Sequence, residues 1–491
     1  MPSASDVASH STPASCWVII AGNAYDVTTF IDVHPGGRDA IMRYAGKDAT
    51  EDYESIHAPS LLKDYADKVI NLGLVEGLSF PTQGGPTSQH LRPGASGSYD
   101  SPSPIPTPGS FLPLNACKSL EDFERSSQTT LSAKAAAYFN SGAESLSTLH
   151  GNRKAWANIR FCPRVLRDVT RVDMTCSIMG SDSTMPVFIA PAAAARLAHP
   201  DAELGFARGA ARMGVVQCVC TYASVKPQDI MDCFQTDPWK RGGALTFQLY
   251  VPQQKERASQ LIQMAKDAGF RALVVTVDSP VIGKRDDDDR FKALADSKVL
   301  EQEVHRLPPL PGQEAETLRG VHCPALIWDD LHWIRAEWGD NPIILKGIQT
   351  AEDALKATMF PVDGIYLSNH GGRQLDYAPN AVEVLLEIRQ KHPEVFDKLE
   401  IYADGGVMRG TDVVKALCLG ARGVGLGRGF LYPLASHGTD GVLRAIQILS
   451  DEIQTTMRLL GVTKLSQLDG SYITYGDGGL SPNTKSSQSK L

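Results

Sequence analysis

The sequence lacks several features that would place it in a simple class. No uninterrupted apolar run approaches the roughly 18 residues of a membrane-spanning helix, so no such helix is expected. The nine cysteines form no C-x-x-C pair and no metal-ligand spacing, which is typical of reduced thiols. With a formal net charge of −8, neither nucleic acid nor an anionic membrane is an expected partner. We recognise no signal peptide or Arg-rich presequence at the N-terminus and expect none.

The C-terminal residues match a targeting signal. Ser489, Lys490 and Leu491 follow a polar run from Pro482 to Gln488. A C-terminal S-K-L is read by the peroxisomal import receptor. We therefore expect residues 476–491 to be a polar tail and the protein to be peroxisomal, with the cytoplasm as the alternative.

The length and one stretch of biased composition predict two domains. At 491 residues the chain is too long for one ordinary core. Between Pro81 and Ser110 lie seven Pro, five Gly and six Ser, with hardly a large apolar residue. Such a stretch buries too little surface to offset its ordering entropy. We predict domains over residues 1–77 and 113–475, joined by a flexible linker over residues 78–112.

The larger domain alternates short apolar runs with helical patterns. Eight runs are typical of strands: residues 185–191, 214–220, 244–250, 272–278, 342–346, 364–370, 400–406 and 423–429. Helical patterns lie between them, at residues 202–213, 253–268, 351–358, 381–391 and 410–419. Eight strands with interleaved helices predict an α/β fold, a closed (β/α)8 TIM barrel. An open doubly wound sheet is the runner-up, but no G-x-G-x-x-G follows the first strand.

One long charged stretch interrupts this alternation. Residues 283–325 contain prolines and the acidic run Asp286–Asp289. We predict a mobile, partly disordered loop, because structureless segments of this length are usually mobile when they occur in a domain. The acidic run is interpreted as a solvated part of that loop and not as a metal site.

Two histidines of the small domain are candidate metal ligands. His34 begins the segment His34–Gly37, where a proline and two glycines turn the chain tightly, and His57 lies two residues before Pro59. A lone histidine is more often structural, but two in such settings favour ligation. The domain resembles the cytochrome b5 family over residues 7–77, on the Trp17 strand, residues 25–28, residues 34–37, residues 46–50 and His57.

The resemblance implies a small α+β domain that holds haem b, with His34 and His57 on the two axial positions. An iron with both positions filled has no open site for oxygen, so this domain is expected to carry single electrons.

Polar side chains end successive strands of the predicted barrel. Tyr250, Asp278, Lys346 and His370 each stand at or just after the end of an apolar run, and Asp404 does the same one strand later. Each alone is compatible with a satisfied structural residue. Five together are hard to explain as packing, because unpaired buried charges are costly. In this fold the active site lies at the C-terminal ends of the strands.

The segments S-N-H-G-G-R-Q-L-D-Y (residues 368–377) and D-G-G (residues 404–406) resemble the FMN-dependent family that oxidises L-2-hydroxy acids. This resemblance runs from about residue 120 to residue 468. A cytochrome b5-like domain joined to such a barrel is similar to the flavocytochrome b2 (L-lactate dehydrogenase) architecture of fungi. The resemblance implies two cofactors, FMN and haem b, and a homotetramer.

The resemblance also implies residue roles. His370 is the catalytic base, Asp278 orients it, and Tyr250 is catalytic and hydrogen-bonds the substrate hydroxyl. Substrate binding falls to Tyr250 with four further residues: Tyr138, Tyr222, Arg285 and Arg373. Of these, Arg373 offers a planar fork to the carboxylate. FMN binding falls to Pro191, Ala192, Ala193, Cys220, Gln248, Thr276, Lys346, Asp404, Gly405, Gly406, Val407, Met408, Gly427 and Arg428.

Several positions depart from the family pattern. Met408 stands where an arginine usually binds the phosphate, and Arg409 is expected to point elsewhere. Ala192 and Cys220 stand where a Thr and a Ser commonly hydrogen-bond the flavin, and Gly429 replaces a Pro. Tyr222 stands where relatives place Leu or Trp. These changes predict weakened FMN affinity and an altered side-chain pocket.

Three functions stay open at this point. The first is a dehydrogenase that passes electrons from a lactate-like 2-hydroxy acid through FMN and haem to a cytochrome c-like acceptor. The second is an oxidase that uses oxygen and produces peroxide, which includes a role in a specialised biosynthetic pathway. The third is a haem-binding electron carrier whose degenerate barrel has lost FMN.

Overall fold

The computed structural model describes residues 2–34, 37–57, 61–62, 65, 67–76, 110–295 and 322–476. The chain divides into two compact units, Met1–Ser110 and Phe111–Leu491, and each is described by itself. Nearly all of the predicted linker lies outside the described residues, as do Pro35, Gly36 and the C-terminal S-K-L. The linker and the peroxisomal address therefore stay predictions.

The N-terminal unit is built on a four-stranded antiparallel sheet in the order β1-β2-β3-β4. Strand β2 carries the core, because its alternate side chains face opposite sides of the sheet. Cys16, Val18 and Ile20 are buried in one apolar cluster, and Ile19 is buried in the other. The elements of this unit are α1 (Ala4–Ser9), β1 (Ser11–Thr12), β2 (Ser15–Ile20), β3 (Asn23–Asp26), η1 (Thr28–Val33), α2 (Arg38–Met42), α3 (Thr50–Ile56) and β4 (Ile70–Leu74).

The second unit is a closed barrel of eight parallel strands in the order β8 to β15. The predicted (β/α)8 barrel with a small α+β domain is thereby confirmed, and the open sheet is excluded. The strands are β8 (Val187–Ile189), β9 (Val216–Cys220), β10 (Ala244–Tyr250), β11 (Leu273–Thr276), β12 (Ile343–Ile348), β13 (Gly364–Leu367), β14 (Glu400–Ala403) and β15 (Gly423–Leu426).

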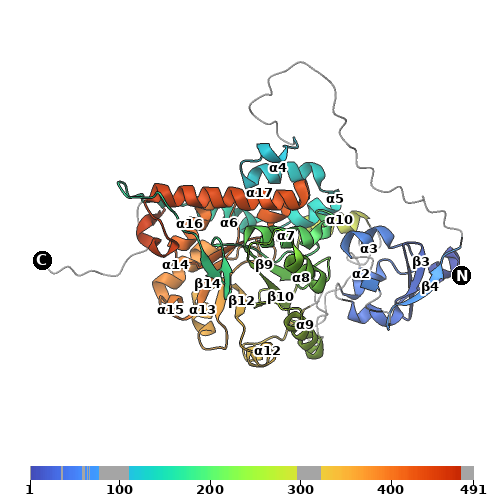
Figure 1. The fold of residues 1–491 in the computed structure, drawn as a ribbon. Coiled ribbons are helices and arrows are strands. Elements are labelled where there is room, and N and C mark those ends of the chain that lie inside the picture. The colour runs from blue at the N-terminus through green and yellow to red at the C-terminus, as the bar shows by residue number, and fades with distance from the viewer. Residues whose placement is uncertain are drawn as a thin grey trace, which may run out of the picture. The chain divides into compact units, whose positions relative to one another are not determined.

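Helices surround the barrel (Figure 1). The last, α17 (Arg428–Leu460), bends at His437 and Gly438 and packs against α4 and α7. The helices that precede the barrel are α4 (Leu120–Thr130), α5 (Ala133–Asn140) and α6 (Ser147–Ala157). The others are α7 (Ala202–Met213), α8 (Pro227–Thr236), α9 (Lys255–Asp267), α10 (Asp286–Ala295), α12 (Asp330–Trp338), α13 (Ala351–Ala357), α14 (Ala381–Lys391), α15 (Val395–Lys398) and α16 (Gly410–Cys418).

A β-hairpin closes the N-terminal end of the barrel. Strands β6 (Cys176–Ile178) and β7 (Ser181–Ser183) pair, and Ile178 and Met179 join a buried cluster with side chains from the barrel interior. The Met179 N–H donates to the buried Tyr402 hydroxyl at 2.7 Å. A second strand pair, β5 (Ile159–Phe161) with β16 (Ile473–Tyr475), joins a segment that precedes the barrel to one that follows it. The C-terminal ends of the strands are left for the functional site.

The prediction of a structureless loop over residues 283–325 is wrong for Asp286–Ala295, which form helix α10. The four aspartates occupy its first turn, where carboxylates are stabilised by the N-terminal end of the helix dipole. Asp288 as a whole is 6% exposed, and its carboxylate accepts from Lys292 at 2.6 Å, one turn further on. Within the described residues no group of three or more metal-ligating side chains occurs, and residues 296–321 lie outside the description.

Candidate active site

A cavity of about 490 Å³ opens at the C-terminal ends of the barrel strands. All the residues predicted to bind substrate and FMN line it except Gln248. Gln248 lies just below, where its amide donates to the Thr276 hydroxyl at 2.8 Å. Of the predicted catalytic residues, His370 and Tyr250 line the cavity, and the buried Asp278 supports His370 from behind. The structure thus brings the predicted barrel residues together, although their chemical roles remain predictions.

His370 lies between an acid and a phenol. Its Nδ1 is 3.0 Å from Asp278 Oδ1, and its Nε2 is 3.0 Å from the Tyr250 hydroxyl. Because a carboxylate only accepts hydrogen bonds, Nδ1 carries the proton and donates to Asp278. Nε2 then presents its lone pair to the cavity, where it accepts from Tyr250. This is the arrangement of an oriented general base.

Burial and neighbouring charges keep His370 and Asp278 in the protonation states that a general base and its orienting carboxylate require. Burial lowers the pKa of His370; Asp278 opposes this shift, but the net pKa stays below its ordinary value. Burial alone would raise the pKa of Asp278, but His370 and Lys346 more than offset it, so that pKa lies below its usual range. Asp278 is therefore ionised and His370 neutral at neutral pH.

Small residues beside Asp278 and His370 let these two side chains come within hydrogen-bonding distance. Gly347 has φ of +111°, and a Cβ there would lie 2.6 Å from the Asp278 Cβ. Ser368 links the base to the buried lysine, since its hydroxyl accepts from Lys346 Nζ at 3.0 Å and from the His370 N–H at 3.1 Å. A side chain at position 347 would therefore displace the orienting carboxylate.

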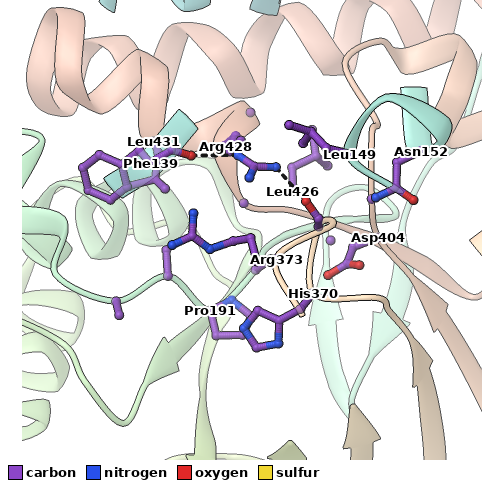
Figure 2. Close-up of a pocket in the computed structure, with 18 of the residues that line it drawn as sticks. Phe139, Leu149, Asn152, Pro191, His370, Arg373, Asp404, Leu426, Arg428 and Leu431 are labelled. Atoms are coloured by element: carbon purple, nitrogen blue, oxygen red, sulfur yellow. Dashed lines mark hydrogen bonds between the residues drawn. The ribbon is translucent and has the colours of Figure 1, made fainter. Parts of the chain in front are cut away.

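Arg373 projects into the same cavity (Figure 2). Its Nη1 donates to the Tyr138 carbonyl at 2.7 Å, and its guanidinium lies 4.9 Å from the Tyr138 ring. No described residue accepts from its Nε or Nη2. Burial, together with the charges of Arg285 and Arg428, lowers the pKa of Arg373 to about 9. A bidentate carboxylate would satisfy both free donor positions and relieve this repulsion.

Three more cations line the cavity without an acidic partner in hydrogen-bonding range among the described residues. Lys346 is 4% exposed and makes one hydrogen bond, to Ser368, although an ammonium has three donors. Arg428 donates to the carbonyls of Phe139, Gly371 and Ser141 at 2.8–2.9 Å (Figure 2). Arg285 donates from Nε to the Arg373 carbonyl at 3.3 Å. This surplus of positive charge fits a ligand set that carries both a carboxylate and a phosphate.

The far end of the cavity fits the FMN phosphate. Gly405 and Gly406 follow β14 with φ of +94° and +75°, and a Cβ on Gly406 would lie 2.3 Å from the Asn152 carbonyl carbon. Gly427 precedes α17, and a Cβ there would meet nothing within 4 Å. The first N–H groups of a helix have no carbonyl partner within it, so they can bind a phosphate. Lys346, inside the barrel mouth, would lie against the anionic edge of the flavin ring.

The departures from the family pattern have different structural outcomes. Arg409 points away from the cavity, as predicted, and pairs with Glu121 at 3.1 Å and Glu452 at 2.9 Å. Met408 is 6% exposed within the apolar core. The Cys220 thiol accepts from the Tyr222 N–H at 3.4 Å, and burial raises its pKa to about 12, so it stays neutral. None of these changes touches the His370 centre.

Many residues that line the cavity were missed from the sequence, among them Glu124, Asn152, Arg153 and His322. Asn152 and Arg153 come from α6, Glu124 comes from α4, and His322 follows the undescribed segment. Asn152 exchanges hydrogen bonds with Asn369 at 2.7 and 2.9 Å, and Arg153 pairs with Glu124 at 2.7 Å. None of these four ends a predicted strand or belongs to a recognised motif, so only the tertiary fold shows that they line the cavity.

The predicted haem ligands meet in the N-terminal unit. The ring centroids of His34 and His57 are 6.0 Å apart, with the planes at 86°. Two metal–imidazole bonds of about 2 Å each, plus half of each ring, span roughly this distance. Burial, and then the charge of His34, lowers the pKa of His57 to about 4, so its ring is neutral as a ligand must be. His34 Nδ1 is 3.2 Å from the Gly37 carbonyl. This contact leaves Nε2 as the ring nitrogen that would bind the iron.

Residues 127–475 match the FMN-dependent dehydrogenase family, and residues 3–75 match the cytochrome b5-like haem/steroid binding domain. The chain therefore belongs to the FMN-dependent dehydrogenase family and carries a cytochrome b5-like domain, with FMN and haem b as its cofactors. Among the described residues no helix is long and apolar enough to cross a membrane.

Individual relatives and a solved structure show which members of this family the chain is similar to. The chain is 38% identical to L-lactate dehydrogenase (cytochrome) of Wickerhamomyces anomalus, covering 94% of this chain and 78% of that protein. It is 36% identical to glycolate oxidase 3 of Arabidopsis thaliana, covering 72% of this chain and 94% of that protein. The flavin-binding domain of baker's yeast flavocytochrome b2 aligns with a TM-score of 0.67 and 37% identity, over 74% of this chain and 88% of that structure. The predicted resemblance to flavocytochrome b2 is thus confirmed.

Proposed function

We propose that the protein oxidises a small L-2-hydroxy acid to the 2-oxo acid and passes the electrons to its haem. The observation that carries the proposal is His370, held between Asp278 and Tyr250 in the cavity that Arg373 enters. Similarity to the L-lactate dehydrogenases (cytochrome) supports it, as does a neighbouring flavocytochrome b2 structure with pyruvate bound.

The side chains divide the work on the substrate. Arg373 binds the carboxylate through Nε and Nη2, and Tyr138 and Arg285 flank it. Tyr250 hydrogen-bonds the C2 hydroxyl, and His370 Nε2 takes up one proton as the substrate loses two electrons and two protons. Asp278 stabilises the imidazolium that forms. Lys346 and the glycine segments would hold FMN, which would accept the two electrons and the second proton. His34 and His57 would hold the haem, which would carry the electrons onward one at a time.

The test is anaerobic addition of a panel of 2-hydroxy acids to the purified holoprotein while the flavin absorbance is recorded. At least one small L-acid should bleach the flavin, and neither its D-enantiomer nor the analogue without a carboxylate should do so. Intact flavin absorbance that no acid bleaches would contradict the proposal.

Oxygen as the final acceptor is the second candidate, because the glycolate oxidases match the barrel without a haem domain. The cytochrome b5-like domain favours the electron relay, for which a cytochrome c-like protein is the proposed acceptor. Peroxide measured against haem reduction during aerobic turnover separates the two candidates. Stoichiometric peroxide with an oxidised haem would establish the oxidase.

Assembly and location complete the proposal. We expect a homotetramer, by resemblance, and recognition of residues 489–491 by the peroxisomal import receptor. Light scattering of the holoprotein gives the mass of the assembly. Location of the full chain in cells, with and without Leu491, tests the address.

A further inference from the structure

His322 is a polar group of the cavity that the proposed reaction does not use. It is 6% exposed, and the neighbouring Cys323 N–H donates to the Val251 carbonyl at 2.9 Å, which fixes this segment beside the end of β10. Its ring stacks on Tyr250, with centroids 4.2 Å apart and planes at 3°. Tyr222 lies 5.7 Å from His322 and 5.4 Å from Tyr250, so the three rings form one aromatic stack.

The protonation of this ring follows from its contacts. Nδ1 is 2.8 Å from the Ser279 carbonyl, which only accepts, so Nδ1 carries the hydrogen. Burial lowers the pKa of His322, which keeps the ring neutral. Nε2 is then an acceptor, and within the described part of the chain no donor reaches it. A buried acceptor without a donor is unfavourable, and a donor on a bound ligand would relieve that cost.

The position of His322 Nε2 relative to the reacting centre indicates which part of a bound substrate it would contact. His322 lines the cavity that holds His370 and Arg373, and it is separated from His370 by the Tyr250 ring. Arg373 takes the substrate carboxylate, and His370 with Tyr250 takes the C2 hydroxyl. Of the two remaining substituents of C2, one is the hydrogen that the reaction removes, and the other is the substrate side chain, which is left to face Tyr222 and His322.

We propose that His322 Nε2 accepts a hydrogen bond from a hydroxyl in the side chain of the substrate, so that the preferred 2-hydroxy acids carry a second hydroxyl. An apolar side chain of equal size would bury Nε2 without a donor. Sites built around such a polar group discriminate strongly against analogues that lack the matching group. This inference rests on the proposed function and names its substrate class.

The test uses two acids of equal size. L-Glycerate and L-2-hydroxybutanoate differ by a hydroxyl in place of a methyl group. We expect kcat/KM to favour glycerate by about 10-fold or more in the natural protein, the equivalent of one unmade buried hydrogen bond. His322→Phe keeps a stacked ring without Nε2 and should bring the ratio near one. His322→Gln restores an acceptor and should recover part of the preference.

A second measurement does not depend on turnover. The dissociation constants of hydroxypyruvate and 2-oxobutanoate, the matching 2-oxo acids, should show the same preference in the natural holoprotein and lose it in His322→Phe. Equal preference in the two proteins, or stronger binding of the dicarboxylates malate and oxaloacetate, would overturn the role of His322. If no acid bleaches the flavin, the proposed function fails, and the 2-oxo acid pair still decides whether His322 selects the ligand.

Discussion

The two ends of the barrel cavity are built on different principles. At the substrate end, His370 is joined to Asp278 and Tyr250 by hydrogen bonds of about 3 Å, and the Ser368 hydroxyl links its backbone N–H to Lys346. The cations there have no acidic partner in hydrogen-bonding range among the described residues. At the phosphate end Arg153 is already paired with Glu124, and Arg428 donates only to backbone carbonyls within the described part of the chain. Arg409, whose side chain lies outside the cavity, pairs with Glu121 and Glu452.

This difference shows where the chain can change without losing its chemistry. The base and its carboxylate depend on one another, so a change in either alters orientation and charge together. We expect the phosphate end to rely on backbone N–H groups and glycines, so Met408 should weaken FMN binding without disturbing the reaction centre. The two ends should therefore respond very differently to substitution.

The largest effect should come from His370→Gln. This change removes the proton acceptor while it leaves an amide of similar size, and we expect flavin reduction to slow by about 10²- to 10⁴-fold. Anaerobic stopped-flow absorbance gives the rate. The haem spectrum is the internal control, since His34 and His57 lie in the other unit. A rate within threefold of that of the natural protein would contradict the distinction between the substrate end and the phosphate end of the cavity.

A smaller loss should follow from Arg373→Lys, which replaces a planar fork by a point charge. We expect kcat/KM to fall by about 10- to 150-fold, the range of a charged hydrogen bond of 1.5–3 kcal/mol. Arg409→Lys is the matched control, because its guanidinium points away from the cavity, and it should change kcat/KM by less than about twofold. Equal losses in the two variants would show that Arg373 has no special role.

The phosphate end is tested by Glu124→Gln. This variant removes a carboxylate beside Arg153 and should tighten FMN binding by about two- to fivefold, the range of a partly exposed ion pair. Titration of flavin-free protein at low and high salt measures the effect, which should shrink as salt rises. Glu121→Gln, the control, removes one of the two carboxylates that pair with Arg409 outside the cavity and should leave FMN affinity unchanged. Weaker FMN binding in Glu124→Gln contradicts this interpretation.

The smallest effect concerns pH. His370 acts as a base only when it is unprotonated, and its pKa lies below the ordinary value of about 6.5. The rate of flavin reduction should therefore rise by less than about 1.3-fold between pH 7 and pH 8 and should fall as the pH drops through that pKa. A pH profile of single-turnover rates measures this, and a limb centred above pH 7 would show that His370 is protonated at rest.

The sequence predicted those parts of the site that follow from strand ends and local motifs. Asp278, Lys346 and His370 could be placed because parallel strands end at one face of a barrel, and His34 and His57 because each has a recognisable local setting. His322 and Arg153 could not, since only the closed barrel brings them to the cavity. The acidic run Asp286–Asp289 was misread because its charges suggested solvation, whereas four carboxylates also favour the first turn of a helix.

The central claim is that electrons leave the substrate at the His370 centre and reach the haem through the flavin. Its most direct test is a single anaerobic turnover with the best acid of the panel, recorded at the flavin and haem absorbance bands together. We expect flavin bleaching first and haem reduction after it, with both phases slowed together by about 10²- to 10⁴-fold in His370→Gln. Haem reduction that comes before flavin bleaching would contradict this order. So would haem reduction that keeps its rate in His370→Gln while flavin bleaching slows.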